Sequence, residues 1–175
     1  TNLTPGNCFA TNNHMTRFGR IKTTYANAVY LANCGNIASH NEVNDAYHQA
    51  IYYKGNNQVV EYNEIYNVCT TTADCGAIYC GRDWTTQGNE VRYNYIHDMT
   101  KVKTTTGHKK WGVYLDDTSA STKVHGNIFN RIDSVILVGG GRNNEFTNNI
   151  IVNCIDTVSF DQRGMSWTNS WLQED

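Results

Sequence analysis

The stretch Val60-Glu61-Tyr62-Asn63-Glu64-Ile65 decides the fold, because its central Asn returns along the whole chain. Each copy stands two residues before an apolar residue, and successive copies are 28, 22, 31, 33 and 22 residues apart. The six copies are Asn13, Asn41, Asn63, Asn94, Asn127 and Asn149. An Asn that returns at about one coil length is typical of a solenoid. Such residues stack in a parallel β-helix, and their amides satisfy backbone groups at the turns. The sequence therefore predicts an all-β parallel β-helix of about six coils.

A short β-rich run follows each Asn and repeats a second pattern. These runs are Ala28–Leu31, Ala50–Tyr53, Ala77–Cys80, Gly112–Leu115, Val135–Val138 and Thr157–Phe160. Strand side chains alternate between two faces, so the second and fourth positions are expected in the core. The third position is then external and reads Tyr30, Tyr52, Tyr79, Tyr114, Leu137 and Ser159. We expect the tyrosines to stack at roughly 4.8 Å, either as a ladder that stiffens the sheet or as a platform for sugar rings.

Composition excludes several classes of protein. The chain of 175 residues is long enough for one structural unit with a real core. It has 14 basic and 16 acidic residues, so nothing indicates the basic footprint of a nucleic-acid binder. No apolar run is long enough to predict a membrane span.

Residues 1–164 are expected to form the coils, and residues 165–175 a tail that folds over the last coil or starts a further segment. The end coils of a solenoid expose open core and need caps, which the N-terminal residues do not offer. We therefore expect a segment of a longer β-helix, with further coils of the same parent chain as partners.

The longest connections precede the Tyr-bearing runs. They are Thr16–Asn27, Tyr66–Gly76 and Met99–Trp111. Insertions on one edge of a solenoid mark a binding face, unless they reflect neutral drift in tolerant loops. Cys69 and Cys75 flank the second of these loops and could pair in an oxidising compartment. The six cysteines and six histidines show no zinc-binding spacing.

Carboxylates gather just beyond the same runs. The external position after each run reads Ala32, Lys54, Gly81, Asp116, Gly139 and Asp161. Asp116 and Asp161 are expected two coils apart, roughly 10 Å by strand spacing, with Gly139 leaving a gap between them. Hydrolysis with inversion needs two carboxyl groups about 6.5–9.5 Å apart. Asp117 alternates with Asp116, so one of the two is expected to face the groove.

Further candidates surround this column. Asp74 and Asp83 stand at opposite ends of the third Tyr-bearing run, although an Asp at a solenoid turn can simply bond local backbone. His48 is expected to face outward, where it could serve as acid or base. The expected substrate-binding residues are Tyr30, Tyr52, Tyr79, Tyr114, His48, Lys54, Arg82, Trp84, Arg142 and Arg163, the arginines being sugar-binding donors or salt-bridge partners.

Three blocks, GRDW at 81–84, YLDD at 114–117 and GGGRNN at 139–144, occur in this order. With them the chain resembles the right-handed parallel β-helix proteins of polysaccharide-degrading bacteria, in particular those around glycoside hydrolase family 141, which have a pectate-lyase-like fold. The resemblance implies a secreted or periplasmic enzyme acting on pectic or xylan-type glycans. Carried over by motif, it favours Asp74 and either Asp116 or Asp117 as catalytic residues, with Asp83 as a further candidate. Column geometry favours Asp116 with Asp161.

Three functions follow from these patterns. The first is a glycoside hydrolase that uses paired Asp residues and needs neither metal nor cofactor. The second is a polysaccharide lyase with Lys54 or Arg82 as base, in which Ca²⁺ neutralises a uronate. The third is a glycan-binding or adhesin β-helix without catalysis.

Overall fold

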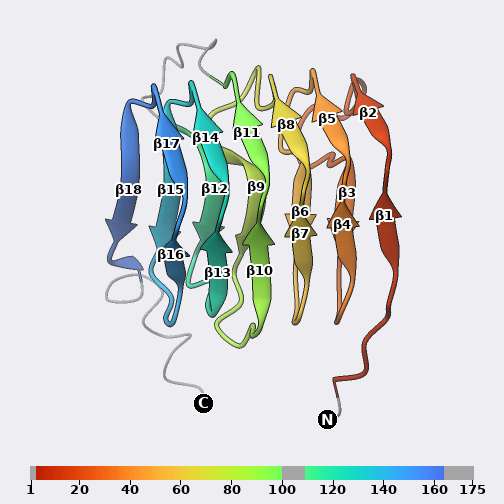
Figure 1. Ribbon diagram of the computed structural model, residues 1–175, viewed down its shortest axis with the longest axis vertical. Coiled ribbons are helices and arrows are strands. Elements are labelled where there is room, and N and C mark those ends of the chain that lie inside the picture. Colours follow the sequence, from red (N-terminus) through yellow and green to blue (C-terminus); the bar gives the residue numbers. More distant parts are fainter. Residues whose placement is uncertain (1–2, 100–108, 164–175) are drawn as a thin grey trace.

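The computed structural model describes residues 3–99 and 109–163 and folds them into three parallel sheets of six strands each (Figure 1). Sheet A contains β1 (Phe9–Thr11), β4 (Ile37–Ser39), β7 (Val59–Glu61), β10 (Asn89–Arg92), β13 (Thr122–His125) and β16 (Glu145–Thr147). Sheet B contains β2 (His14–Thr16), β5 (Glu42–Asn44), β8 (Glu64–Tyr66), β11 (Tyr95–His97), β14 (Ile128–Asn130) and β17 (Ile150–Val152). Sheet C contains β3 (Val29–Leu31), β6 (Ile51–Tyr53), β9 (Cys75–Gly81), β12 (Lys110–Asp116), β15 (Ser134–Gly139) and β18 (Asp156–Asp161).

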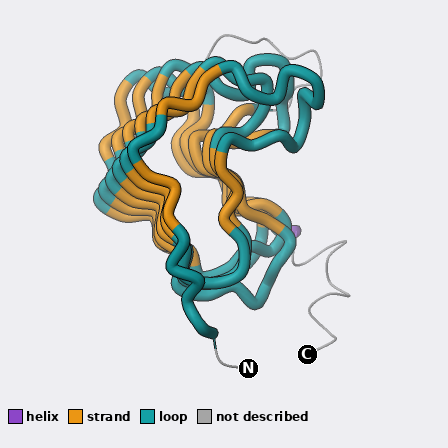
Figure 2. Tube along the Cα trace, turned by 90° about the vertical axis from the view of Figure 1, so that its right-hand side faces the viewer, coloured by secondary structure: helices purple, strands orange, loops and turns teal. Residues whose placement is uncertain are grey.

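Each coil contributes one strand to each sheet, so the chain is a right-handed parallel β-helix of six coils, as the sequence predicts. Seen along the stack, the coils lie over one another and enclose a narrow core (Figure 2). Buried Val, Ile, Leu, Ala and Phe side chains from all three sheets fill that core. Within the described residues, no helix is long and apolar enough to cross a membrane.

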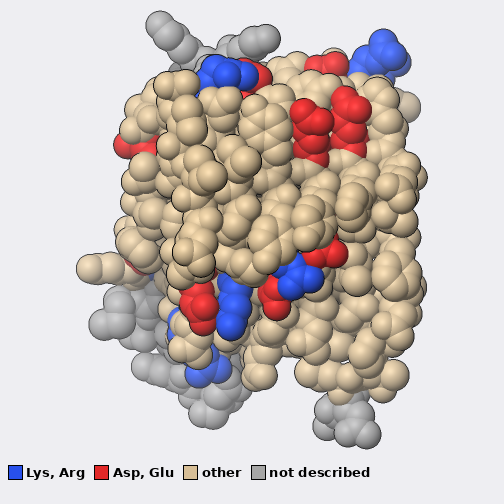
Figure 3. All heavy atoms as spheres, in the orientation of Figure 1, with Lys and Arg blue, Asp and Glu red and all other residues tan. Residues whose placement is uncertain are grey.

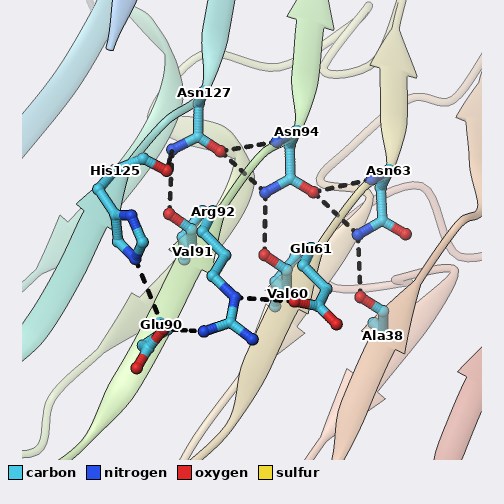
Figure 4. Close-up of polar contacts among 10 residues, drawn as sticks. All are labelled: Ala38, Val60, Glu61, Asn63, Glu90, Val91, Arg92, Asn94, His125 and Asn127. Carbon is cyan, nitrogen blue, oxygen red and sulfur yellow. Dashed lines mark hydrogen bonds and ion pairs between the residues drawn. The ribbon is translucent and has the colours of Figure 1, made fainter. Parts of the chain in front are cut away.

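The predicted Asn ladder forms at the turn between sheets A and B (Figure 4). The Oδ1 of Asn94 accepts the backbone N–H and the side-chain Nδ2 of Asn63, both at 3.0 Å. The Nδ2 of Asn94 in turn donates to the carbonyl oxygen of Val60 at 2.9 Å and to Oδ1 of Asn127 at 3.0 Å. The turn is tight because the residue before each Asn is left-handed, with φ of 53° at Tyr62 and 56° at Tyr93. The ladder thereby satisfies polar groups that neither sheet reaches.

The predicted registers of sheet C are confirmed. Tyr30 pairs with Tyr52, Tyr52 with Tyr79, and Tyr79 with Tyr114. The flanking Val, Ile and Leu columns enter the core as expected. Phe160 occupies the same inward column but is 76% exposed, because β18 is the last strand of its sheet.

The expectation that His48 faces outward is wrong. Ala50 and Ile51 are consecutive, yet both pack in the core, and Ala77 with Ile78 does the same. The alternation of faces is therefore interrupted at the start of these strands. Counting faces back from Ile51 through Ala50 then assigns the residues before Ala50 to the wrong side. His48 is consequently buried.

The long connections all join sheet B to sheet C. Of the predicted loop Met99–Trp111, residues 100–108 lie outside the described residues, and so does the predicted tail at 165–175. The loops at Thr16–Asn27 and Tyr66–Gly76 are described and border the start of the Tyr-bearing strands. All six cysteines are free thiols.

Candidate functional site

A network of charged side chains surrounds the guanidinium of Arg163, just beyond β18. Its Nε donates to Oδ2 of Asp161 at 2.6 Å, and Nη1 donates to Oδ1 of Asp117 at 2.8 Å. Nη1 also bonds Oδ1 of Asp116. Nη2 lies 3.4 Å from the hydroxyl of Tyr114. Arg163 therefore joins three carboxylates from two coils that have one further coil between them.

The gap predicted at Gly139 is the space that Arg163 occupies. Gly139 pairs with Asp161 on one side, and the strand on its other side ends at Asp116. A Cβ at Gly139 would lie 3.4 Å from the guanidinium carbon of Arg163. A Cβ in this position would touch the guanidinium and would crowd the backbone nitrogen of Asp117 and the carbonyl oxygen of Leu115, both at 3.2 Å. The glycine therefore leaves room for one cation to reach the carboxylates of both neighbouring coils.

Asp116 is buried on the inner side of this network. The hydroxyl of Tyr79 donates to its Oδ2 at 2.9 Å, and the backbone N–H of Asp117 donates to its Oδ1 at 3.0 Å. Burial raises the pKa of Asp116, and the hydrogen bond from Tyr79 opposes that rise. Asp117 is also buried and accepts Nε of the exposed Arg82 at 2.9 Å. These two carboxylates hold the arginines in place.

Tyr114 links the network to Asp74. Its hydroxyl donates to Oδ1 of Asp74 at 2.8 Å. Although Tyr114 belongs to the external column, it is only 2% exposed, because Trp111 and Leu137 pack around it. Burial raises the pKa of the Tyr114 hydroxyl well above its ordinary value, so this group stays protonated and donates.

A groove of about 330 Å³ runs over these residues. Its lining is Asp74, Lys109, Trp111, Tyr114, Leu137, Ser159, Phe160, Asp161 and Arg163. Asp74 and Asp161 are the carboxylates in this lining, whereas Asp116 and Asp117 lie beneath Arg163. The groove thus combines an aromatic floor with two accessible carboxylates.

The tyrosine column changes its geometry as it approaches this network. Tyr30 and Tyr52 are stacked, with ring centroids 4.8 Å apart and planes 23° apart. Tyr79 and Tyr114 instead meet edge to face, at 5.5 Å and 82°. Stacked rings cover one another's faces, so the first pair is a stiffening ladder and offers mainly ring edges to solvent. Tyr79 and Tyr114 have turned so that their hydroxyls reach Asp116 and Asp74.

Several predicted residues lie away from the groove. Asp83 accepts the backbone N–H and the hydroxyl of Thr85, at 3.0 and 2.7 Å, as a turn residue does. Lys54 lines a separate hollow of about 610 Å³ beside Tyr30.

Trp84 and Arg142 are brought together, with the guanidinium carbon 4.7 Å from the ring centroid. They line a hollow of about 400 Å³ that reaches Phe160 and Asp161. This hollow adjoins the groove because both have Phe160 and Asp161 in their linings.

His48 lies behind the groove and does not line it. Burial lowers its pKa, and the nearby charge of Asp74 opposes that change. Its ring packs against Tyr25, with centroids 5.2 Å apart. The imidazole is therefore a buried neutral group at ordinary pH, unlike the exposed acid or base that the sequence suggested.

Sequence reasoning missed Trp111 and Lys109. Trp111 has the parity of a core residue when alternation is counted back from Val113, but it packs on the outer side against Tyr114. Lys109 lies at the groove edge, where its Nζ is 2.5 Å from Oδ2 of Asp156. The sequence does contain a signal, since a Lys-Lys-Trp run directly precedes the Tyr-bearing run Gly112–Leu115.

The face formed by sheets A and B offers a contrasting arrangement (Figure 3). Most of it is uncharged, and acidic and basic side chains lie side by side in its lower part. Arg92 there donates to Oε2 of Glu61 at 2.7 Å and also pairs with Glu90 (Figure 4). These charges neutralise one another along the surface, which fits a stabilising role.

Within residues 3–99 and 109–163, no group of three or more His, Cys, Asp and Glu side chains is arranged to hold a metal ion. The positive charge among Asp116, Asp117 and Asp161 is supplied by Arg163.

Fold and site together define a parallel β-helix protein with a groove on one sheet that is lined by aromatic, acidic and basic side chains. Comparison with protein-family models gives no match for this chain. Neither the curated proteins nor the solved structures give one.

Proposed function

We propose that this protein is a carbohydrate-active enzyme, a glycoside hydrolase that cleaves polysaccharide in the groove of sheet C. The observation that carries the proposal is the pairing of Asp74 and Asp161 in one lining with Trp111 and Tyr114. Sugar rings have apolar faces and polar edges, so an aromatic floor beside carboxylates suits them. The resemblance of the sequence to glycoside hydrolase family 141 supports the same class and a secreted or periplasmic location.

The groove suggests a role for each carboxylate. Asp161 accepts Nε of Arg163 at 2.6 Å, which fixes the position of its carboxyl group in the groove lining, so we assign it as the group that activates water or attacks the sugar. Asp74, which lines the same groove, is assigned as the proton donor to the leaving oxygen. Asp116 and Asp117 act through Arg163 as positioning residues.

Substitution of the two carboxylates tests the proposal. Asp161→Asn and Asp74→Asn should each lower the release of reducing ends from a polysaccharide by at least about 100-fold, the contribution expected of a catalytic carboxyl group. Asp83→Asn is the matched control, because the hydrogen bonds described for the Asp83 carboxylate go to Thr85 in its own turn. This substitution should leave the rate unchanged. Unfolding curves of all three variants should show that the fold persists. Full activity in both groove variants would remove the assignment.

A non-catalytic glycan-binding protein is the second candidate, favoured by the aromatic side chains of Trp111 and Tyr114 in the groove lining. That function predicts saturable sugar binding and no new reducing ends after long incubation with the unsubstituted protein.

A further inference from the structure

The loop that carries Asp74 begins and ends at a cysteine. Cys69 precedes it, and Cys75 starts β9 directly after Asp74. Cys69 and Asp74 both have left-handed backbone, with φ of 55° and 60°, so the chain turns at both ends of the loop. The two thiols are fully buried, and Cys75 lies close enough to Cys69 to add to the rise that burial produces in the pKa of the Cys69 thiol. The fold therefore brings two sulfur atoms together at the base of a short loop.

Hydrogen bonds to neighbouring residues hold both cysteines in these positions. The N–H of Cys69 donates to the carbonyl oxygen of His48 at 3.1 Å. On the other side, Cys75 donates from Sγ to the carbonyl oxygen of Thr72 at 3.5 Å, and the Thr72 hydroxyl lies 3.7 Å from the same sulfur. The loop thus folds over Cys75, and Asp74 reaches from it toward the hydroxyl of Tyr114.

Lys110 affects the ionisation of the two cysteine thiols. It lies opposite Cys75 in the register of β9 and β12, and it is buried. Its positive charge favours the thiolate of Cys69, whereas burial acts more strongly and raises the pKa of that thiol well above its ordinary value. Disulfide exchange requires a thiolate and access to the oxidant. A thiolate and access to the oxidant are both more available before the loop has folded, because folding buries the two thiols.

We propose that Cys69 and Cys75 form an intramolecular disulfide while the chain folds in an oxidising compartment, and that this bond closes the loop carrying Asp74. The two thiols lose two protons and two electrons as the sulfur–sulfur bond forms. A low-molecular-weight disulfide takes up these electrons and protons and is reduced to two thiols. The bond restricts the open loop and so stabilises the position of Asp74 against Tyr114.

Refolding in a redox buffer tests this proposal without reference to catalysis. The reduced, unfolded full chain is refolded with oxidised and reduced glutathione, alkylated, digested and analysed by mass. The expected product is a peptide pair joined through Cys69 and Cys75 and lighter by two hydrogen masses, with Cys8, Cys34, Cys80 and Cys154 alkylated. Alkylation of both Cys69 and Cys75, or a bond from either to another cysteine, would overturn the proposal.

Two further measurements separate this bond from general thiol oxidation. The Cys8→Ser/Cys154→Ser variant, which lacks the more accessible thiols, should oxidise like the unsubstituted chain. The oxidised protein should melt several degrees higher than its reduced form, a difference that the Cys69→Ser/Cys75→Ser variant should lack. Folded, reduced protein given the same oxidant should form the bond at least ten times more slowly than the refolding chain. Equal rates would contradict the role assigned to burial.

Discussion

The guanidinium carbon of Arg163 lies 3.4 Å from the point where a Cβ at Gly139 would stand. The same absent Cβ would be 3.2 Å from the backbone nitrogen of Asp117. This glycine and this arginine are complementary, since one leaves the space that the other fills. The arrangement of the groove depends on that fit, because Arg163 connects the accessible Asp161 with the buried Asp116 and Asp117.

Gly139→Ala should therefore disturb Arg163 and lower the free energy of unfolding. Overpacking of this kind costs about 1–3 kcal/mol. Gly139 is not among the residues with positive φ, so backbone strain does not add to the effect. Urea unfolding measures the change, and Thr157→Ala, at an exposed position of the neighbouring β18, is the control. Equal stability of Gly139→Ala and the parent protein would show that Arg163 does not need this space.

Asn94→Ala should destabilise the protein more strongly. The substitution removes the acceptor of the backbone N–H of Asn63 and the side-chain donor to the carbonyl oxygen of Val60, whereas Nδ2 of Asn63 keeps its bond to the carbonyl oxygen of Ala38. Each unsatisfied buried polar group costs about 1–3 kcal/mol, so a loss above about 3 kcal/mol is expected.

Asn13→Ala is the matched control for the ladder. Asn13 makes ladder bonds to Asn41 but is exposed, so water can replace what is lost. Chemical denaturation should give it a clearly smaller effect than Asn94→Ala. Similar losses at the two positions would contradict the burial argument.

The hydroxyl of Tyr66 gives a pH prediction. Its hydrogen bond to Oε1 of Glu42, at 2.7 Å, raises the pKa of Tyr66 to about 12 from 10.0. Because the folded-state pKa is the higher one, this bond contributes stability below pH 10 and loses that contribution as the pH rises toward 12.

Glu42→Gln should shift the pKa of Tyr66 back toward 10.0. Glu64→Gln, on the same strand as Tyr66, should shift it less. NMR of chain labelled at the tyrosine ring carbon that bears the hydroxyl follows this titration directly. An ordinary pKa for Tyr66 in the unsubstituted protein would refute the assignment.

Much of the fold could be predicted because its signals are periodic. Asn63 and its equivalents mark one turn in every coil, and Ile51 and its equivalents mark one inward column. The position of His48 could not be read in this way. Two consecutive core residues, Ala50 and Ile51, interrupt the alternation of inward and outward side chains, and no local sequence pattern predicts this interruption.

The candidate site could be predicted only in part. The column of Asp116, Gly139 and Asp161 follows from strand register, and the structure has it. The position of Arg163 over Asp116 and Asp117 depends on packing across coils, which strand register does not specify. For the same reason the strand register predicts Asp116 and Asp161, two coils apart in one column, as the carboxylate pair, whereas Asp74 and Asp161 line the groove.

The central claim is that water adds across a glycosidic bond in this groove. The most direct measurement is digestion of a panel of plant polysaccharides in water enriched in oxygen-18, followed by mass analysis of the products. Hydrolysis should place one heavy oxygen at the new reducing end of each fragment, and Asp161→Asn should suppress that labelled product. Fragments without the label and with an unsaturated uronate end would establish elimination instead, and the absence of any fragment would contradict catalysis altogether.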